Sequence, residues 1–404
     1  MKRAFYLLQM AKEKMKIIGL LLLTIVVTNG MEDLALKEVA KGNNEFSARL
    51  YKELIKTNNG NLIVSPLSIE TILALTSLGA KGETATELQK GLNLPSDPQQ
   101  IKDQYKLLQT YMINGRFVTL NSANKIYIEN GFGIAPEFLE VATNDFGSGV
   151  ENVNFGETDK TSSKINKWVE DRTNGKIKNL ISPDLLNELT RIVLVNALYF
   201  KGQWLHPFKA EDTKPLDFHK SKDETIQVDT MQTTGFLRLA EDETLGATFV
   251  ELPYRGTPAV LSIVMPNEIG GLDSLESNLH ALLRFQNFTK ENIKLFLPKF
   301  KVETSLNLVE TLQNLGVKKI FNRDADLSGI SLQEGLIVSN VVQKVFMDVD
   351  EKGTEAAAST AVISMARSAG FGRLVRRTIK IDRPFLFFLK LNEVVLFGGR
   401  INNL

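Results

Sequence analysis

Apolar residues recur at helical spacing near the start of the chain, between residues 45 and 56. They are Phe46, Leu50, Tyr51 and Leu54. One apolar residue every three or four positions is typical of a helix with one face in the core. The polar run 57–60 then ends the pattern, so an amphipathic surface helix is predicted over 45–56.

A second helix is predicted to begin at Ser65 and Pro66. Serine is a common helix cap, and proline suits the first turn, where its missing N–H would have no partner. The apolar residues that follow surround the helix axis: they are Leu67, Ile69, Ile72, Leu73, Leu75 and Leu78. A helix that is apolar all round lies inside a protein, so we expect this helix to be buried.

Strands dominate the pattern of the second half. Residues 192–200 are almost all apolar or β-branched, as expected of an interior strand covered on both faces. Further strands are predicted at 259–265 and 293–302, and a helix at 304–315 that Gly316 ends. Because helices come first and strands later, without regular alternation, the predicted fold class is α+β with large mixed or antiparallel sheets.

Composition agrees with one large globular domain. The 404 residues are 43% hydrophobic and 24% charged, and no Pro-, Gly- or Ser-rich linker divides them. The formal net charge of +1 gives no reason to expect nucleic acid or an anionic membrane as a partner. The absence of cysteine excludes disulfides, thiolate zinc sites and a cysteine nucleophile.

The N-terminus has the pattern of a secretory signal peptide. Basic residues precede the apolar run 17–27, and small residues at Thr28 and Gly30 fit cleavage before Met31, with Met15 as an alternative start. A membrane anchor is the other interpretation, but the run is short for a bilayer span. We expect residues 1–30 to be removed and a single domain, 31–404, to be secreted into the extracellular space as a glycoprotein, since Asn287 is in the only N-glycosylation sequon.

The residues give no catalytic centre. His206, His219 and His280 are not at metal-ligand spacing and are not near a nucleophile motif. The sequence Gly-Phe-Gly at 370–372 lacks the third glycine and the preceding strand of a dinucleotide-binding motif. We therefore expect neither an enzyme nor a metal or other cofactor.

The most unusual stretch of the chain is 351–360, Glu-Lys-Gly-Thr-Glu-Ala-Ala-Ala-Ser-Thr. It contains no large apolar residue and lies between the strand-like run 341–349 and an arginine-bearing segment. By composition alone it could begin a helix, with Thr354 as the cap and alanines as strong helix formers.

The chain resembles the serpin family of serine protease inhibitors over residues 45–402. The resemblance rests on separated motifs that are specific only in combination: NLIVSPLS at 61–68, INKWV at 165–169, TNGKI at 173–177, NALYFKGQW at 196–204, the stretch 351–360, and DRPF at 382–385. It implies three β-sheets packed with about nine helices. It also implies an exposed reactive loop at about 351–376, joined to a central strand of the largest sheet.

The resemblance gives the small residues of the loop a role. In this family the cleaved loop inserts as a new strand of the largest sheet. Side chains of a strand alternate, so one set would face the core: Thr354, Ala356, Ala358, Thr360, Val362, Ser364 and Ala366. All seven are uncharged and small to medium, whereas Glu355 belongs to the set expected to face solvent.

This segment is the predicted hinge of the loop. Its residues are Glu351, Gly353, Thr354, Glu355, Ala356, Ala357, Ala358, Ser359 and Thr360. The composition favours an inhibitor over a non-inhibitory member of the family that acts as a carrier, storage protein or chaperone. A hydrolase would be a third possibility, and it would require turnover.

Two arginines compete as the cleaved residue. Counting the family's usual sixteen positions from Glu351 gives Arg367 followed by Ser368, and counting back from Pro384 leaves Arg373 followed by Leu374 as the alternative. We favour Arg367 because the hinge side of the loop must match the insertion slot. Either arginine suits a trypsin-like serine protease, whose pocket carries a buried carboxylate, and the expected product is a covalent complex with a monomeric inhibitor.

The resemblance also implies a region that controls opening of the largest sheet. Its expected members are Asn61, Ser65, Ser68, Asn196, Trp204 and Gln343. Gln343 stands where many vertebrate serpins have a histidine. An amide can make the same hydrogen bonds but cannot titrate, so no histidine-type pH switch is expected there.

Two further expectations concern partners. The basic cluster Arg376, Arg377, Lys380 and Arg383, together with Arg373, could bind a sulfated polysaccharide or could form a solvated sheet edge. In style the sequence is similar to arthropod haemolymph serpins that restrain immune protease cascades, which suggests a role in innate immunity.

Overall fold

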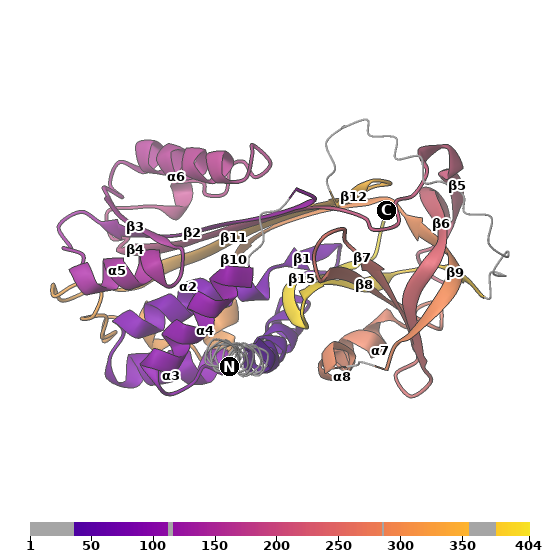
Figure 1. The fold of residues 1–404 in the computed structure, drawn as a ribbon. Coiled ribbons are helices and arrows are strands. Elements are labelled where there is room, and N and C mark those ends of the chain that lie inside the picture. The colour runs from indigo at the N-terminus through magenta and orange to yellow at the C-terminus, as the bar shows by residue number, and fades with distance from the viewer. Residues whose placement is uncertain (1–35, 112–115, 285–286, 355–376) are drawn as a thin grey trace, which may run out of the picture.

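The computed structural model describes residues 36–111, 116–284, 287–354 and 377–404 (Figure 1). Its centre is a six-stranded sheet with helix α6 on one face and α2 and α4 on the other. A second, nine-stranded sheet lies beside it. No helix in the described part of the chain is long and apolar enough to cross a membrane.

Nine α-helices are present in the described residues, which agrees with the expected number. The first covers residues 36–54 and contains the predicted amphipathic segment. The others are α2 (Pro66–Gly79), α3 (Gly82–Leu92), α4 (Pro98–Tyr111), α5 (Pro136–Asn144), α6 (Thr158–Arg172), α7 (Leu272–Ser277), α8 (Leu279–Arg284) and α9 (Val309–Asn314). Helix α2 is buried along almost its whole length, as its apolar circumference predicts.

The six-stranded sheet has the order β10-β11-β12-β4-β2-β3. Its strands are β10 (Phe300–Asn307), β11 (Val338–Val349), β12 (Gly353–Thr354), β4 (Ile192–Gln203), β2 (Val118–Glu129) and β3 (Gly149–Val153). β4 and β11 lie parallel at the centre, and their other full-length neighbours, β2 and β10, are antiparallel to them. The interior strand predicted at 192–200 is therefore confirmed.

The nine-stranded sheet has the order β1-β15-β14-β8-β7-β6-β9-β13, with β5 paired to β6. Its strands are β1 (Leu62–Val64), β5 (Lys214–His219), β6 (Thr225–Asp242), β7 (Ala247–Pro253), β8 (Ala259–Pro266), β9 (Thr289–Pro298), β13 (Arg377–Lys380), β14 (Phe385–Leu391) and β15 (Val394–Ile401). β6 pairs with β5 through its first residues and with β7 through its last. The long strand β6 thus joins two of the three expected sheets into one hydrogen-bonded network.

Two local predictions were wrong in detail. The segment predicted as a helix from residue 304 is strand β10 as far as Asn307, because each of its residues pairs with β11, and the helix α9 begins only at Val309. Pairing across the sheet outweighs local helix propensity here. Ser65 does occupy the N-cap of α2, but its hydroxyl donates to the carbonyl of Leu396 at 2.7 Å instead of capping the helix.

Candidate functional site

The two central strands of the six-stranded sheet are closed against each other along most of their length. The parallel ladder runs from Val338 opposite Ile192 to Phe346 opposite Tyr199. Beyond Phe346 the two strands part, and the short strand β12 lies between them. We call the line between β4 and β11 the slot, because a continuation of β12 would lie there.

A tight turn leads the chain from β11 back into the mouth of the slot. The carboxylate of Asp350 accepts hydrogen bonds from the backbone N–H groups of Lys352 at 2.8 Å and Gly353 at 3.1 Å. Burial raises the pKa of Asp350, and these two N–H donors act against that rise. The indole Nε1 of Trp204 donates to the carbonyl of Asp350 at 2.9 Å, so the predicted residue Trp204 does lie where the hinge enters.

The side chain of Glu351 fixes the outer side of the same turn. It accepts a hydrogen bond from the hydroxyl of Thr213 at 2.8 Å and pairs with the ammonium group of Lys299 at 3.1 Å. Partial burial raises the pKa of this carboxyl group, but backbone and side-chain hydrogen bonds, including those from Thr213 and Lys299, outweigh it and leave the pKa below its ordinary value. The first hinge residue is thus anchored at neutral pH.

The next two hinge residues already belong to the sheet. Gly353 lies opposite Gln203 and Thr354 opposite Gly202, antiparallel to β4. Thr354 is fully buried, and its hydroxyl lies 2.5 Å from that of Tyr254, whose ring stacks on Trp204 at 4.6 Å between centroids. Burial raises the pKa of Tyr254, which keeps this phenol neutral. Thr354 therefore faces the core, as expected of the first residue of the core-facing set.

The remaining loop residues lie outside the described part of the chain, which ends at Thr354 and resumes at Arg377. They include the hinge residues Glu355, Ala356, Ala357, Ala358, Ser359 and Thr360, and both candidate bonds, Arg367–Ser368 and Arg373–Leu374. The predicted signal peptide, residues 1–30, also lies outside the described residues.

One prediction about the loop needs correction, namely that its second set of side chains would face solvent. Val193, Val195 and Ala197 of β4 are buried in a small core under α6, to which Ile165 and Val169 of that helix also belong. A strand added beside β4 would therefore meet α6 with its second set of side chains along most of the slot. Only near the mouth, at the half-buried Lys201, does this face of β4 approach solvent.

Four of the predicted sheet-opening residues form one buried hydrogen-bond cluster beside the slot. The Gln343 amide accepts from the backbone N–H of Ser65 at 3.0 Å and donates to its carbonyl at 3.0 Å. It also donates to Asn196 Oδ1, and Asn196 Nδ2 in turn donates to the hydroxyl of Ser68. Because Gln343 and Asn196 are opposite residues of β11 and β4, the cluster joins the two strands of the slot to helix α2.

A fifth member of the cluster, Asn124, was not predicted. Its Oδ1 accepts from Asn196 Nδ2 at 2.6 Å and from the hydroxyl of Ser68 at 3.0 Å. It lies opposite Asn196 on β2 and is buried. The only signal in the sequence is a polar residue within a strand, and the pairing of β2 with β4 decides where that residue points.

Asn61 lies apart from the cluster. Its Nδ2 donates to the carbonyl of Asn403 at 2.6 Å, and its Oδ1 accepts from the N–H groups of Asn402 and Asn403 at 2.7 and 2.9 Å. This side chain thus fastens the C-terminal residues to the start of β1. Asn61 was expected in the sheet-opening region, but in the structure it has no hydrogen bond with the cluster described above.

Of the other predicted sites, Arg373 and Arg376 lie outside the described residues. Asn287 is exposed between α8 and β9. In the basic cluster, Arg377 pairs with Glu241, and Arg383 pairs with Asp382 at 2.8 Å. These ion pairs weaken the cluster as a polyanion site, and binding of a sulfated polysaccharide stays a prediction. No group of three or more histidine or acidic side chains in the described residues could hold a metal ion.

Comparisons with known proteins agree with this geometry. The family model described as Serpin (serine protease inhibitor) matches residues 41–404. Antichymotrypsin-2 and antitrypsin of Bombyx mori are 37% and 36% identical to the chain over 363 residues, which cover 89% of it and 96% and 92% of those proteins. The crystal structure of Serpin48, described as a highly specific serpin of the insect Tenebrio molitor, superposes with a TM-score of 0.85 at 40% identity and covers 91% of this chain and 98% of that one.

Proposed function

The chain belongs to the serpin family, and from that premise we propose that it is a secreted inhibitor that traps a trypsin-like serine protease at Arg367. The observation that carries the proposal is the mouth of the slot, where Gly353 and Thr354 have already begun a strand antiparallel to β4. The rest of the slot is closed. A fold with a strand started but not completed can gain stability by completing it.

The register of this short strand supports Arg367 as the cleaved residue. Continued along β4, it would set Ser364 opposite Ile192, the first residue of that strand. Arg367 would then lie level with Leu189, three residues past the end of β4, where the side chain is 77% exposed. Arg373 would lie nine residues beyond the start of β4, roughly 30 Å of extended chain. A protease attached by so long a segment would not be held against the inhibitor.

The same register supports full insertion of the hinge. Ala356, Ala358 and Thr360 would lie opposite Phe200, Leu198 and Asn196 of β4, whose side chains face the buried core. Glu355 would lie opposite Lys201, at the half-buried mouth of the slot, where opposite charges on neighbouring strands attract. On the α6 side, Ala357, Ser359 and Ala361 are small enough to fit beneath that helix.

The mechanism follows from these positions. The protease serine attacks the carbonyl carbon of Arg367, the bond to the Ser368 nitrogen breaks, and the acyl group remains on the serine as an ester. Insertion from residue 355 to 367 carries this ester about 43 Å along the sheet. In this mechanism the protease supplies the catalytic groups, so we expect no turnover by the serpin itself.

The relatives support protease inhibition as the general activity. They do not indicate which class of protease is inhibited, which depends on the sequence of the loop. The two silkworm proteins are named for opposite specificities, antichymotrypsin and antitrypsin, at nearly the same identity to this chain. Overall similarity therefore does not choose the target class, and an arginine at the cleaved position favours a trypsin-like enzyme.

The matched variants Arg367→Ala and Arg373→Ala test the proposal. We expect wild type and Arg373→Ala to form a trypsin complex that survives denaturing electrophoresis, whereas Arg367→Ala should form it at least 100-fold more slowly. Mass spectrometry should show that the released C-terminal peptide begins at Ser368. Loss of the complex only in Arg373→Ala would move the site to Arg373, and cleavage without any complex would favour a non-inhibitory carrier or storage protein.

Secretion has a separate test. Expression of the full chain in insect cells should give a protein in the medium whose N-terminal residue is Met31. Treatment with an N-glycosidase should lower its mass if Asn287 carries a glycan. Retention of residues 1–30 in a membrane fraction would contradict secretion.

A further inference from the structure

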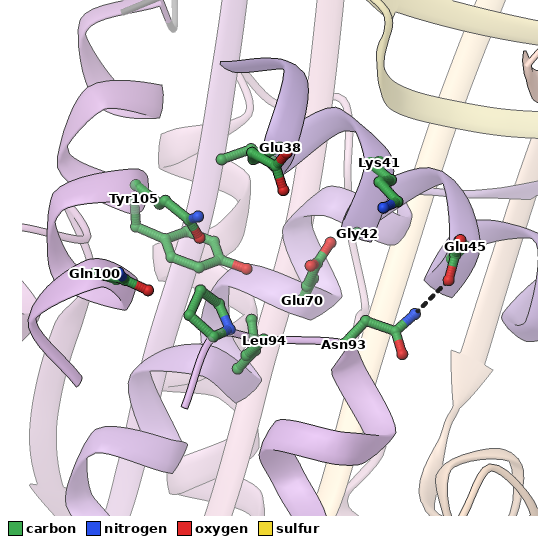
Figure 2. Close-up of a pocket in the computed structure, with 12 residues that line it drawn as sticks. Glu38, Lys41, Gly42, Glu45, Glu70, Asn93, Leu94, Gln100 and Tyr105 are labelled. Carbon is green, nitrogen blue, oxygen red and sulfur yellow. Dashed lines mark hydrogen bonds between the residues drawn. The ribbon is translucent and has the colours of Figure 1, made fainter. Parts of the chain in front are cut away.

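A cavity of about 610 Å³ lies between the helix over residues 36–54, α2, α4 and the segment that follows α3 (Figure 2). This volume is in the range of sites that bind small molecules. Its apolar wall includes Val39, Leu94 and Pro95. None of its lining residues belongs to the hinge or to the sheet-opening cluster.

A buried carboxyl group points into this cavity. Glu70 of α2 is only 4% exposed, and its Oε2 accepts a hydrogen bond from Asn43 Nδ2 at 2.9 Å. Asn43 is itself fixed, since its Oδ1 accepts from the backbone N–H of Val395 at 3.0 Å. Figure 2 shows the carboxyl groups of Glu70 and Glu38 and the hydroxyl of Tyr105 pointing toward the same space.

Among the described residues no cation forms an ion pair with Glu70. The positive charge of Arg49 acts on Glu70, but its guanidinium group donates to the carbonyl of Gly91 at 2.7 Å and forms no ion pair with the carboxyl group. A buried carboxyl group without a counter-ion is costly to ionise, and burial raises the pKa of Glu70 to about 8. When Glu70 is ionised, the site therefore lacks a positive charge that could pair with it.

The rim of the cavity carries charges of both signs. Glu38, Lys41 and Glu45 come from the helix over residues 36–54, and Glu45 is held by Arg284 and Asn93. The segment 93–95 brings no charged group, and α4 brings amide side chains and Tyr105. Arg284 already pairs with Glu45, and Lys41 offsets the charge of Glu38, so an ionised Glu70 would be the one uncompensated charge among the lining residues. Anions are thus disfavoured and cations attracted.

We propose that this cavity binds a small organic cation, an ammonium group on a compact apolar body, with Glu70 as its counter-ion. The ammonium would contact the Glu70 carboxyl group, to which the Tyr105 hydroxyl is hydrogen-bonded, on the side that faces Glu38. The apolar body would lie against Val39, Leu94 and Pro95. Because the bound cation favours the ionised carboxylate, binding at neutral pH releases a proton from Glu70 to solvent.

Calorimetric titration with phenethylamine and with its neutral analogue phenethyl alcohol tests this site on the wild-type protein. We expect the amine to bind at least tenfold more tightly than the alcohol at pH 8, and its affinity to fall at least tenfold between pH 8 and pH 6 as Glu70 becomes protonated. At pH 7, titrations in two buffers of different ionisation enthalpy should show release of close to one proton.

Two variants assign the effect to Glu70. Glu70→Gln should lose the preference for the amine and the proton release, whereas Glu310→Gln, a change of an exposed glutamate on α9, should keep both. If Glu70→Gln does not fold, the comparison of amine and alcohol on the wild-type protein still decides whether the cavity prefers a cation. Equal affinity for the two compounds, binding of neither, or binding of the amine without proton release would overturn the proposal.

Discussion

At the scale of single residues, two glycines fix where the hinge enters the sheet. A Cβ atom on Gly353 would lie 1.8 Å from the carbonyl oxygen of Gly202, and one on Gly202 would lie 2.5 Å from the ring of Tyr254. Neither position accepts a side chain without a shift of backbone or ring. The two glycines let the chain pass close to the end of β4, with Thr354 buried directly afterwards.

Ala358→Arg should convert the inhibitor into a substrate. The register from Thr354 would set residue 358 opposite the buried Leu198, so insertion would bury an unpaired guanidinium at a cost of several kcal/mol. Cleavage by trypsin precedes insertion and should proceed normally. The measurement is the number of inhibitor molecules consumed per protease inactivated, which should rise more than tenfold.

The matched control is Glu355→Gln, which removes a charge at the half-buried mouth of the slot and should change that ratio less than twofold. Trapping by Ala358→Arg at the wild-type ratio would contradict the register.

At the scale of elements, helix α6 acts as a cover over the slot. Its Ile165 and Val169 belong to one buried cluster with Val193 and Val195 of β4 and Val342 of β11. These contacts stabilise the closed pair of strands. They would also have to rearrange if a new strand separated β4 from β11, so we expect the packing of α6 to set part of the barrier to the proposed insertion.

Ile165→Ala should therefore shorten the life of the active form. Removing this buried side chain should cost about 2–5 kcal/mol of stability and should ease opening of the slot. The expected result is faster spontaneous loss of trypsin inhibition at 37 °C, without cleavage, as the intact loop enters the sheet.

Leu88→Ala in α3 is a suitable control, because Leu88 is equally buried but belongs to the main core. It should lower the unfolding midpoint by a similar amount and leave the inhibitory half-life longer than that of Ile165→Ala. Equal half-lives would show that α6 does not limit insertion.

At the scale of the whole molecule, the native fold holds two central parallel strands that a third can separate. The β4–β11 ladder has eight residue pairs between Val338 and Phe346. In five of them, Val342 to Phe346, the β11 residue also pairs with β10 and the β4 residue with β2. An added strand would be antiparallel to both β4 and β11. The sheet would then exchange the one β4–β11 ladder for two new ladders and would keep β2 and β10 as outer neighbours.

Cleavage should thus stabilise the entire chain. We expect trypsin-cleaved protein to unfold roughly 10 °C or more above the intact protein, since several kcal/mol of added stability moves the midpoint by this amount in a large domain. Differential scanning calorimetry on both forms is the measurement. Cleaved Ala358→Arg should keep the intact midpoint, and a wild-type midpoint unchanged by cleavage would indicate a non-inhibitory serpin.

The sequence by itself determined the elements that depend on local pattern. Continuous apolar residues from 192 to 200 predict the central strand, the apolar circumference of 66–79 predicts a buried helix, and separated motifs identify the family. The hinge was predicted from the family resemblance and from small uncharged residues at alternate positions, and of these the structure places Thr354 in the sheet. These signals are local, and tertiary context reinforces them.

Only the tertiary structure decided which distant residues meet. Pairing of β2 with β4 brought Asn124 into the cluster, pairing of β1 with β15 directed Asn61 to the C-terminus, and pairing of β10 with β11 kept residues 304–307 in a strand. The position of α6 turned an expected solvent face into a second core. Such outcomes depend on contacts between segments far apart in the chain, which no local pattern encodes.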